Sequence, residues 1–188
     1  MRIIAGFAGG RRLRGPTGNK TRPTSDRVRE ALFSILGEPP EGCQVLDLFA
    51  GSGGLGLEAL SRGATRAVFV DRDKDAQQVL RHNIAEVGVV KTSDVHQADA
   101  LRALAKFERS GKQFHWIFID PPYATDLAEQ ALEAIGSSTL LHDTESDGAI
   151  VVEHDKRSAP GDAYGCLLRT ETRRYGDTSV SFYERNSA

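Results

Sequence analysis

The stretch Val45-Leu46-Asp47-Leu48-Phe49-Ala50-Gly51-Ser52-Gly53-Gly54 decides the fold of this chain of 188 residues. It is typical of a buried strand that opens into a glycine-rich loop. A second strand end, Asp120-Pro121-Pro122-Tyr123, follows further along the chain. In an open α/β sheet such loops lie together at the carboxyl edge, where ligands bind. The two stretches therefore predict one site that is built from the ends of two strands.

Size and composition indicate one globular domain, or one domain with a small appendage. The hydrophobic content of 39% and the charged content of 27% are typical of such proteins. No apolar run approaches the ~20 residues that a membrane span requires, and the N-terminus lacks the apolar core of a secretory signal. Cys43 and Cys166 are too few for a disulfide framework. We therefore expect a reduced, cytoplasmic setting.

Charge is distributed unevenly along the chain, although the net charge is only −2. Residues 1–29 hold eight of the 24 basic residues but only one of the 26 acidic residues, Asp26. A basic arm on an acidic body predicts a polyanionic partner for the arm. A solvated, flexible terminus explains an arginine run equally well.

Hydrophobic periodicity predicts an α/β fold. A helix capped by Thr24 or Ser25 carries one apolar face and ends at Gly37. Strands and helices then alternate, with strands expected at 44–49, 66–71, 93–98, 115–119 and 148–153 and helices at 54–62, 73–86, 100–109 and 126–136. Several of these strands are apolar on both faces, as parallel strands covered by helices are.

Both ends of the chain differ from this alternating pattern. Residues 165–174 and 178–185 predict two strands joined near Gly176-Asp177, and hence an antiparallel hairpin. Residues 2–5 and 11–14 predict a small N-terminal hairpin. We therefore expect a Rossmann-like sheet with an antiparallel C-terminal hairpin and a short N-terminal arm.

The glycine loop and the acid that follows it predict a nucleoside site. Gly51, Gly53 and Gly56 match G-x-G-x-x-G, a pattern that is weak alone and fits a dinucleotide site equally well. Glycine lets the main chain turn tightly and approach a ligand closely. Asp71 ends the next apolar strand, where a carboxylate can accept both hydroxyls of a ribose. The alternative is that Asp71 only caps the next helix.

Two further aspartates lie at or near strand ends. Asp47 is flanked by Leu46 and Leu48, so its carboxylate must find hydrogen-bond donors or a cation. A cofactor with an ammonium or sulfonium group would gain from that anion. Asp99, next to Ala100, could accept from an adenine amino group or could cap the helix at 100–109.

Asp120-Pro121-Pro122-Tyr123 is the sharper signal. The prolines hold an extended turn, which lets the carbonyl of Pro121 point outward beside the Asp120 carboxylate. Two such acceptors suit an exocyclic NH₂ group, and Tyr123 offers a flat face on which a base could stack. The alternative is a strand end followed by a rigid turn. The histidines and cysteines show no paired spacing for a metal, so we expect no metal site. No G-x-S-x-G elbow is present, so a nucleophilic serine is not expected either.

These motifs resemble class I S-adenosylmethionine-dependent methyltransferases, and more closely the bacterial 16S rRNA guanine-N2 methyltransferases of the RsmD type. The resemblance covers nearly the whole chain. Its specific part is N-terminal: Met1-Arg2-Ile3-Ile4-Ala5-Gly6, Gly10-Arg11-Arg12-Leu13 and Arg22-Pro23-Thr24-Ser25-Asp26-Arg27-Val28-Arg29-Glu30-Ala31-Leu32-Phe33. The glycine loop and the Asp-Pro-Pro-Tyr box recur across many amino-group methyltransferases. Ser25-Asp26-Arg27 could equally be a helix cap and first turn.

The resemblance implies a seven-stranded sheet and methyl transfer from S-adenosylmethionine to N2 of a guanine in 16S rRNA. It implies catalytic roles for Asp120, Pro121, Pro122 and Tyr123. It implies cofactor contacts for Arg22, Pro23, Thr24, Asp47, Phe49, Ala50, Gly51, Ser52, Gly53, Asp71, Arg72, Asp99, Ala100 and Asp120. RNA contacts are expected from Arg11, Arg12, Arg14, Lys20 and Arg22.

The same resemblance predicts the organisation and the partners. Residues 1–23 would form a basic arm, and residues 24–188 a methyltransferase domain. The partner would be 16S rRNA or the assembling small ribosomal subunit, with no membrane contact, and we expect a monomer. Other functions compatible with the motifs are an NAD-dependent oxidoreductase, a methyltransferase acting on DNA adenine N6 or a protein amide, and a non-catalytic RNA-binding module.

Overall fold

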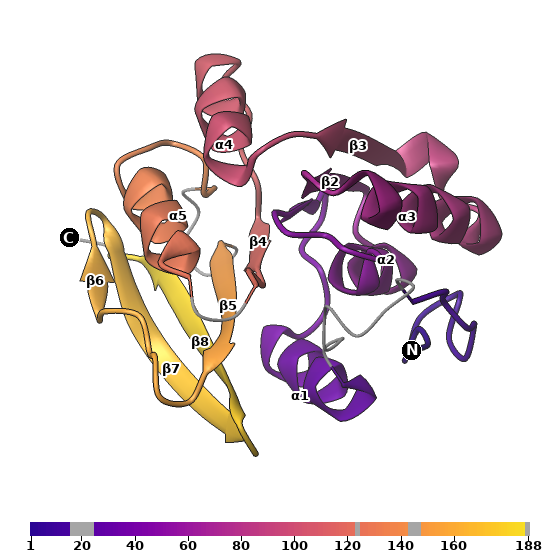
Figure 1. Cartoon of the computed structure of the whole chain (residues 1–188), viewed down its shortest axis with the longest axis horizontal. Helices are drawn as coiled ribbons and strands as arrows, with labels where there is room; N and C mark the ends of the chain where they lie inside the picture. The colour runs from indigo at the N-terminus through magenta and orange to yellow at the C-terminus, as the bar shows by residue number, and fades with distance from the viewer. Residues whose placement is uncertain (16–24, 123–124, 143–147, 187–188) are drawn as a thin grey trace.

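One mixed sheet organises the computed structural model, which describes residues 1–15, 25–122, 125–142 and 148–186. Across these residues eight strands have the order β3-β2-β1-β4-β5-β8-β7-β6 (Figure 1). Five of them pair in parallel: β1 (Gln44–Asp47), β2 (Arg66–Asp71), β3 (Ser93–Gln97), β4 (Trp116–Ile119) and β5 (Ala149–Asp155). The remaining three pair antiparallel: β6 (Ala163–Tyr164), β7 (Leu167–Tyr175) and β8 (Thr178–Arg185).

The expected α/β fold with an antiparallel C-terminal hairpin is confirmed. The sheet has one strand more than the seven expected, because the two-residue β6 pairs with the start of β7. So short a strand has no period that a sequence could reveal. It forms where Gly165, at φ +55°, turns the chain so closely over Gly136 that a Cβ atom would lie 2.2 Å from the Gly136 carbonyl oxygen.

Helices cover both faces of the sheet. One face carries α1 (Asp26–Leu36), α2 (Gly54–Ser61) and α3 (Lys74–Val87) over side chains such as Phe69 and Phe118. The other carries α4 (Ala100–Arg109) and α5 (Leu127–Gly136), and a short 3₁₀ helix, Val90–Thr92, precedes β3. None of the helices in the described ranges is both long and apolar enough to cross a membrane.

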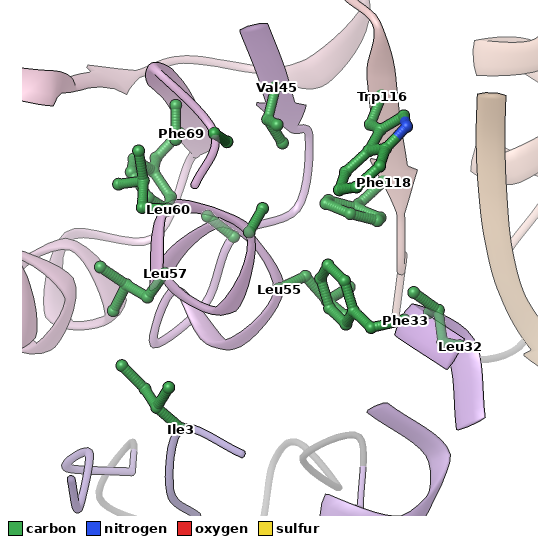
Figure 2. Close-up of a cluster of buried hydrophobic side chains, with 14 of the residues drawn as sticks. Ile3, Leu32, Phe33, Val45, Leu55, Leu57, Leu60, Phe69, Trp116 and Phe118 are labelled. Atoms are coloured by element: carbon green, nitrogen blue, oxygen red, sulfur yellow. The ribbon is translucent and has the colours of Figure 1, made fainter. Parts of the chain in front are cut away.

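Side chains from α1, α2 and the sheet form the core under the first face (Figure 2). Phe33 of α1 contacts Trp116 and Phe118 of β4, with ring centroids 6.1 and 5.7 Å apart. Leu57 and Leu60 of α2 extend the same cluster. Burial of these aromatic and branched side chains fixes α1 against β4.

The N-terminal segment covers the outer side of α2. Its pairing is a single antiparallel bridge between Arg2 and Arg12, supported by backbone bonds from Ile3 to Arg11 and from Leu13 to Met1. Ile3, Ala8 and Leu13 are buried in the core shared with α1 and α2. We call residues 1–15 the N-terminal hairpin. Because α2 is apolar nearly all round, it needs this second cover as well as the sheet.

Candidate cofactor and substrate site

Parallel pairing brings the ends of β1, β2 and β4 to one rim of the sheet. Asp47 of β1 lies opposite Phe69 in β2 and opposite Phe118 in β4. Asp71 and Asp120 each follow these partners by two residues. They therefore lie on the same rim, on either side of the loop that follows β1. We call this edge the carboxyl rim.

Asp71 holds the glycine loop. One of its carboxylate oxygens, Oδ2, accepts a hydrogen bond from the Gly51 N–H at 2.8 Å, and the other accepts from the Asp73 N–H at 2.8 Å. Asp73, not Asp71, caps α3 by accepting from the N–H groups of Asp75 and Ala76. The carboxylate of Asp71 is half-buried, and each of its oxygens has a further lone pair that can accept a hydrogen bond. The helix-cap alternative for Asp71 is therefore excluded.

Asp47 lies beneath the loop and is only 2% exposed. Its Oδ2 atom accepts from the Gly56 N–H at 3.0 Å, in the first turn of α2. The donor that a carboxylate at this position requires is thus a backbone N–H at the start of a helix. Burial, together with a smaller effect of the nearby Asp71, raises the pKa of Asp47 to about 7, although the hydrogen bond from Gly56 lowers it.

Each glycine of the G-x-G-x-x-G pattern has its own structural reason. Gly51 has φ +53°, and a Cβ atom there would meet nothing within 4 Å, so the loop is open on that side. Gly53 has φ +85°, and its Cβ would lie 2.5 Å from Leu80 of α3. At Gly56 a Cβ would lie 2.3 Å from the Phe69 ring, so this glycine lets α2 pack closely on β2.

Two amides of α3 that the sequence reasoning missed also support the rim. Asn83, 1% exposed, donates to the carbonyl oxygens of Ser52 and Arg14 at 2.9 and 3.0 Å and accepts from the Arg14 N–H. Gln77 donates to the Asp71 carbonyl at 2.9 Å. Gln77 and Asn83 lie on the same face of α3 as the buried Leu80 and Ile84. The helical spacing of these residues in the sequence could therefore have indicated that both amides are buried.

Asp99 follows β3 and caps α4. Its Oδ1 atom accepts from the N–H groups of Leu101 and Arg102 at 3.1 and 3.3 Å. The capping interpretation is therefore confirmed, and contact of its carboxylate with adenine stays a prediction. Ala100 is buried, and Arg72, after β2, is exposed.

The loop after β4 begins at the rim between β1 and β5. Asp120 and Pro121 are half-buried, and Pro122 is exposed and accepts from the Thr125 hydroxyl at 2.9 Å through its carbonyl. Tyr123 lies outside the described residues, as do Lys20, Arg22, Pro23 and Thr24. Stacking on Tyr123, the cofactor contacts of Arg22, Pro23 and Thr24, and the RNA contacts of Lys20 and Arg22 stay predictions.

The basic side chains of the N-terminal hairpin face outward. Arg11, Arg12 and Arg14 are exposed, and Arg11 donates to the backbone carbonyl of Glu86 in α3. The hairpin is anchored by Glu58 of α2, whose fully buried carboxylate accepts from the N–H groups of Ile4 and Ala5. Its exposed arginines are therefore displayed on a fixed support.

Arg29 is the second feature that sequence reasoning missed. It is only 1% exposed, and its guanidinium donates to the Arg2 carbonyl at 2.6 Å and to Asp26 at 2.8 Å. Burial lowers its pKa, while Asp26, Glu58 and Glu153 act against that. Ser25 caps α1 by accepting from the Val28 N–H, so Ser25 and Asp26 form a cap and first turn.

Comparison with known proteins decides the family. A family model described as Conserved hypothetical protein 95, the RsmD family, matches residues 1–184. The chain belongs to this family. It is 41% identical to the "Putative rRNA methyltransferase YlbH" of Bacillus subtilis over 185 residues, which are 98% of this chain and 99% of that protein.

Other members of the RsmD family are similar over most of the chain. The Ribosomal RNA small subunit methyltransferase D of Escherichia coli K12 is 37% identical over 76% of this chain and 70% of its own. The solved structure named "Putative methyltransferase yhhF from Escherichia coli" superposes with a TM-score of 0.83 at 33% identity. It covers 100% of this chain and 99% of that one. The Rossmann-like methyltransferase architecture is thus shared with these proteins.

Proposed function

We propose that this RsmD-family chain transfers a methyl group from S-adenosylmethionine to the exocyclic N2 of a guanine in 16S rRNA. One observation carries the proposal: the register of β1, β2 and β4 puts the Gly51 loop, Asp71 and Asp120 on the same rim. The family and the names of its rRNA methyltransferase members support it.

The residues at the rim fit the cofactor. The open side of Gly51 leaves space for a methionyl group against the main chain. Asp71, half-buried with both oxygens already oriented by backbone N–H groups, suits the two ribose hydroxyls. Asp47 would contribute indirectly, because its hydrogen bond from the Gly56 N–H fixes the start of α2 directly after the glycine loop. When bound, S-adenosylmethionine supplies a methyl group that its sulfonium has already activated.

The chain itself would position and polarise the acceptor. Guanine N2 is a weak nucleophile because its lone pair is delocalised into the ring. The Asp120 carboxylate and the Pro121 carbonyl would each accept a hydrogen bond from the NH₂ group, which favours a localised lone pair directed at the donor. Holding the two reactants in line and excluding water accounts for most of the remaining rate.

A base in folded RNA must be splayed out before it reaches the rim, at a cost of a few kcal/mol. Contacts between phosphates and residues 1–23, proposed as the RNA-binding arm of a methyltransferase domain at 24–188, would offset part of that cost. Such contacts make binding fall steeply with salt.

The decisive experiment measures methyl transfer from labelled S-adenosylmethionine to small ribosomal subunits and to 16S rRNA, with the product nucleoside identified by mass spectrometry. Asp120→Ala should abolish transfer and retain cofactor binding by calorimetry. Asp126→Ala is the matched control, because Asp126 is exposed and its side chain does not cap α5. Full activity of Asp120→Ala would contradict the assigned role. Methylation of DNA adenine or of a protein amide instead of rRNA, or tighter binding of NADH than of S-adenosylmethionine, would contradict the function.

A further inference from the structure

A groove of about 330 Å³ lies between the start of α1 and the turn that joins β7 to β8. Among the described residues, its lining contains two arginines and no carboxylate: Ser25, Arg27, Val28, Arg174, Tyr175 and Gly176. Val28 and Tyr175 pack into the core and form an apolar floor. Arg27 and Arg174 are exposed above it. The groove thus combines positive charge with an apolar surface.

The two aspartates that adjoin the lining residues in the sequence, Asp26 and Asp177, are paired with other cations. Asp26 pairs with Arg2 and Arg29, and Asp177 pairs with Lys156. By contrast, within the described part of the chain neither Arg27 nor Arg174 forms an ion pair or a side-chain hydrogen bond. Two exposed guanidinium groups with no carboxylate between them suit an anion, and arginine binds phosphate through two parallel hydrogen bonds.

The groove lies on the carboxyl rim. Asp155, the last residue of β5, pairs with Thr178 of β8, which pairs with Tyr175 of β7. The turn at Gly176 is therefore at the same edge as Asp120, which follows β4. From β4 to β7 there are three strand spacings, about 14 Å in all. Figure 1 shows the β7–β8 turn and α1 on the lower side, toward which β4 and β5 point.

The N-terminal hairpin lies on the opposite flank of the rim. It is anchored on α2 and α3 through Glu58, Ser61 and Asn83. These helices pack on β1, β2 and β3, whereas the groove adjoins β7. Asp120, at the end of β4, thus lies between two elements that expose basic side chains, the N-terminal hairpin on one flank and the groove on the other.

We propose that this groove binds the sugar-phosphate backbone of the rRNA segment next to the target guanine. Arg27 and Arg174 would hold phosphates, and Val28 and Tyr175 would support a sugar. Both arginines act as positioning residues, which hold the strand so that the splayed base enters beside Asp120. The inference rests on the proposed function and adds a second RNA contact to the N-terminal arm.

The test measures filter binding of a 16S rRNA transcript over a series of salt concentrations, together with KM and kcat on small ribosomal subunits. Arg27→Gln and Arg174→Gln should each weaken RNA binding roughly 3–10-fold. Each should also make the negative slope of log K against log salt shallower by about 0.7, because one phosphate contact is lost. KM for the subunit should rise, and kcat at saturating substrate should hold. The matched control is Arg109→Gln, an exposed arginine at the end of α4 and on the opposite rim.

Cofactor affinity and the thermal unfolding midpoint should not change in either variant, because these side chains contact neither the glycine loop nor another charge. Unchanged RNA affinity and KM in the double variant, which carries both Arg27→Gln and Arg174→Gln, would overturn the inference. An equal loss of RNA affinity in Arg109→Gln would also overturn it. If the parent protein does not methylate rRNA, the proposed function fails. If it does and the double variant is indistinguishable from it, only the role of the groove fails.

Discussion

The carboxylate of Asp71, at the end of β2, holds the Gly51 N–H of the neighbouring loop at 2.8 Å. The two residues are twenty positions apart, and the bond fixes the loop after β1 to the strand beside it. The same carboxylate is the candidate ribose acceptor. It therefore shapes the loop and would bind the ligand.

Asp71→Ala should lower affinity for S-adenosylmethionine about 10–100-fold, since it removes a charged acceptor and releases the loop. Isothermal titration calorimetry measures the loss. Asp75→Asn, an exposed acid in the first turn of α3, serves as the control. Unchanged affinity in Asp71→Ala would show that Asp71 has only a structural role.

Asp47 should make stability depend on pH. Its pKa is raised by burial to about 7 in the folded chain and is near 3.8 when unfolded. The contribution of Asp47 to the free energy of unfolding is therefore fully present below pH 3.8, where the carboxyl is protonated in both states. It is lost as the pH rises through about 7. Between pH 5.5 and pH 8 its contribution should fall by about 2 kcal/mol. Urea unfolding at the two pH values measures the change.

Asp47→Asn provides the comparison, because the amide oxygen can still accept from Gly56 and carries no charge at any pH. Its stability should change less between the two pH values than that of the parent protein. An equal change in both proteins would assign the pH dependence to other groups.

Glu58→Gln should destabilise the chain by about 3 kcal/mol. The carboxylate accepts from Ile4, Ala5 and Arg62, and a neutral amide cannot satisfy all three donors. The N-terminal hairpin should loosen, so that trypsin cleaves after Arg11, Arg12 and Arg14 faster than in the parent. Glu30→Gln, on the exposed side of α1, should leave both measurements unchanged.

Asn83→Ala should cost about 2 kcal/mol, because the carbonyls of Ser52 and Arg14 lose a buried donor. The variant should also bind the cofactor more weakly, and trypsin should cleave its N-terminal hairpin faster. Both effects are expected because the Asn83 side chain bonds to the glycine loop at Ser52 and to the hairpin at Arg14. Gln78→Ala, exposed on the same helix, is the control. Loss of stability with neither of the other two effects would contradict the coupling.

Local pattern was sufficient to predict most of the fold. Runs such as Trp116–Ile119 are apolar on both faces, as expected of a parallel strand that helices cover on both sides. Gly37 and Gly88 end α1 and α3 as expected, since a positive φ at these positions suits glycine. The candidate rim followed from two strand ends and the geometry of parallel sheets.

The supporting contacts could not be predicted in this way. Helical spacing could place Asn83 on the buried face of α3, but the partners of Arg29, Glu58 and Asn83 are distant in the sequence. A local window contains the helix but not the hairpin or loop that covers it. The groove of Arg27 and Arg174 is likewise formed only when β7 and β8 complete the sheet.

The cover that residues 1–15 place over α2 also bears on the order of assembly. Ile4 and Ala5 are synthesised before their acceptor, Glu58, which is more than fifty positions later in the sequence. Such long-range closure is slow relative to local helix formation. The N-terminal hairpin should therefore dock late, although it is synthesised before α2, and until then the leucines that it covers on α2 stay exposed.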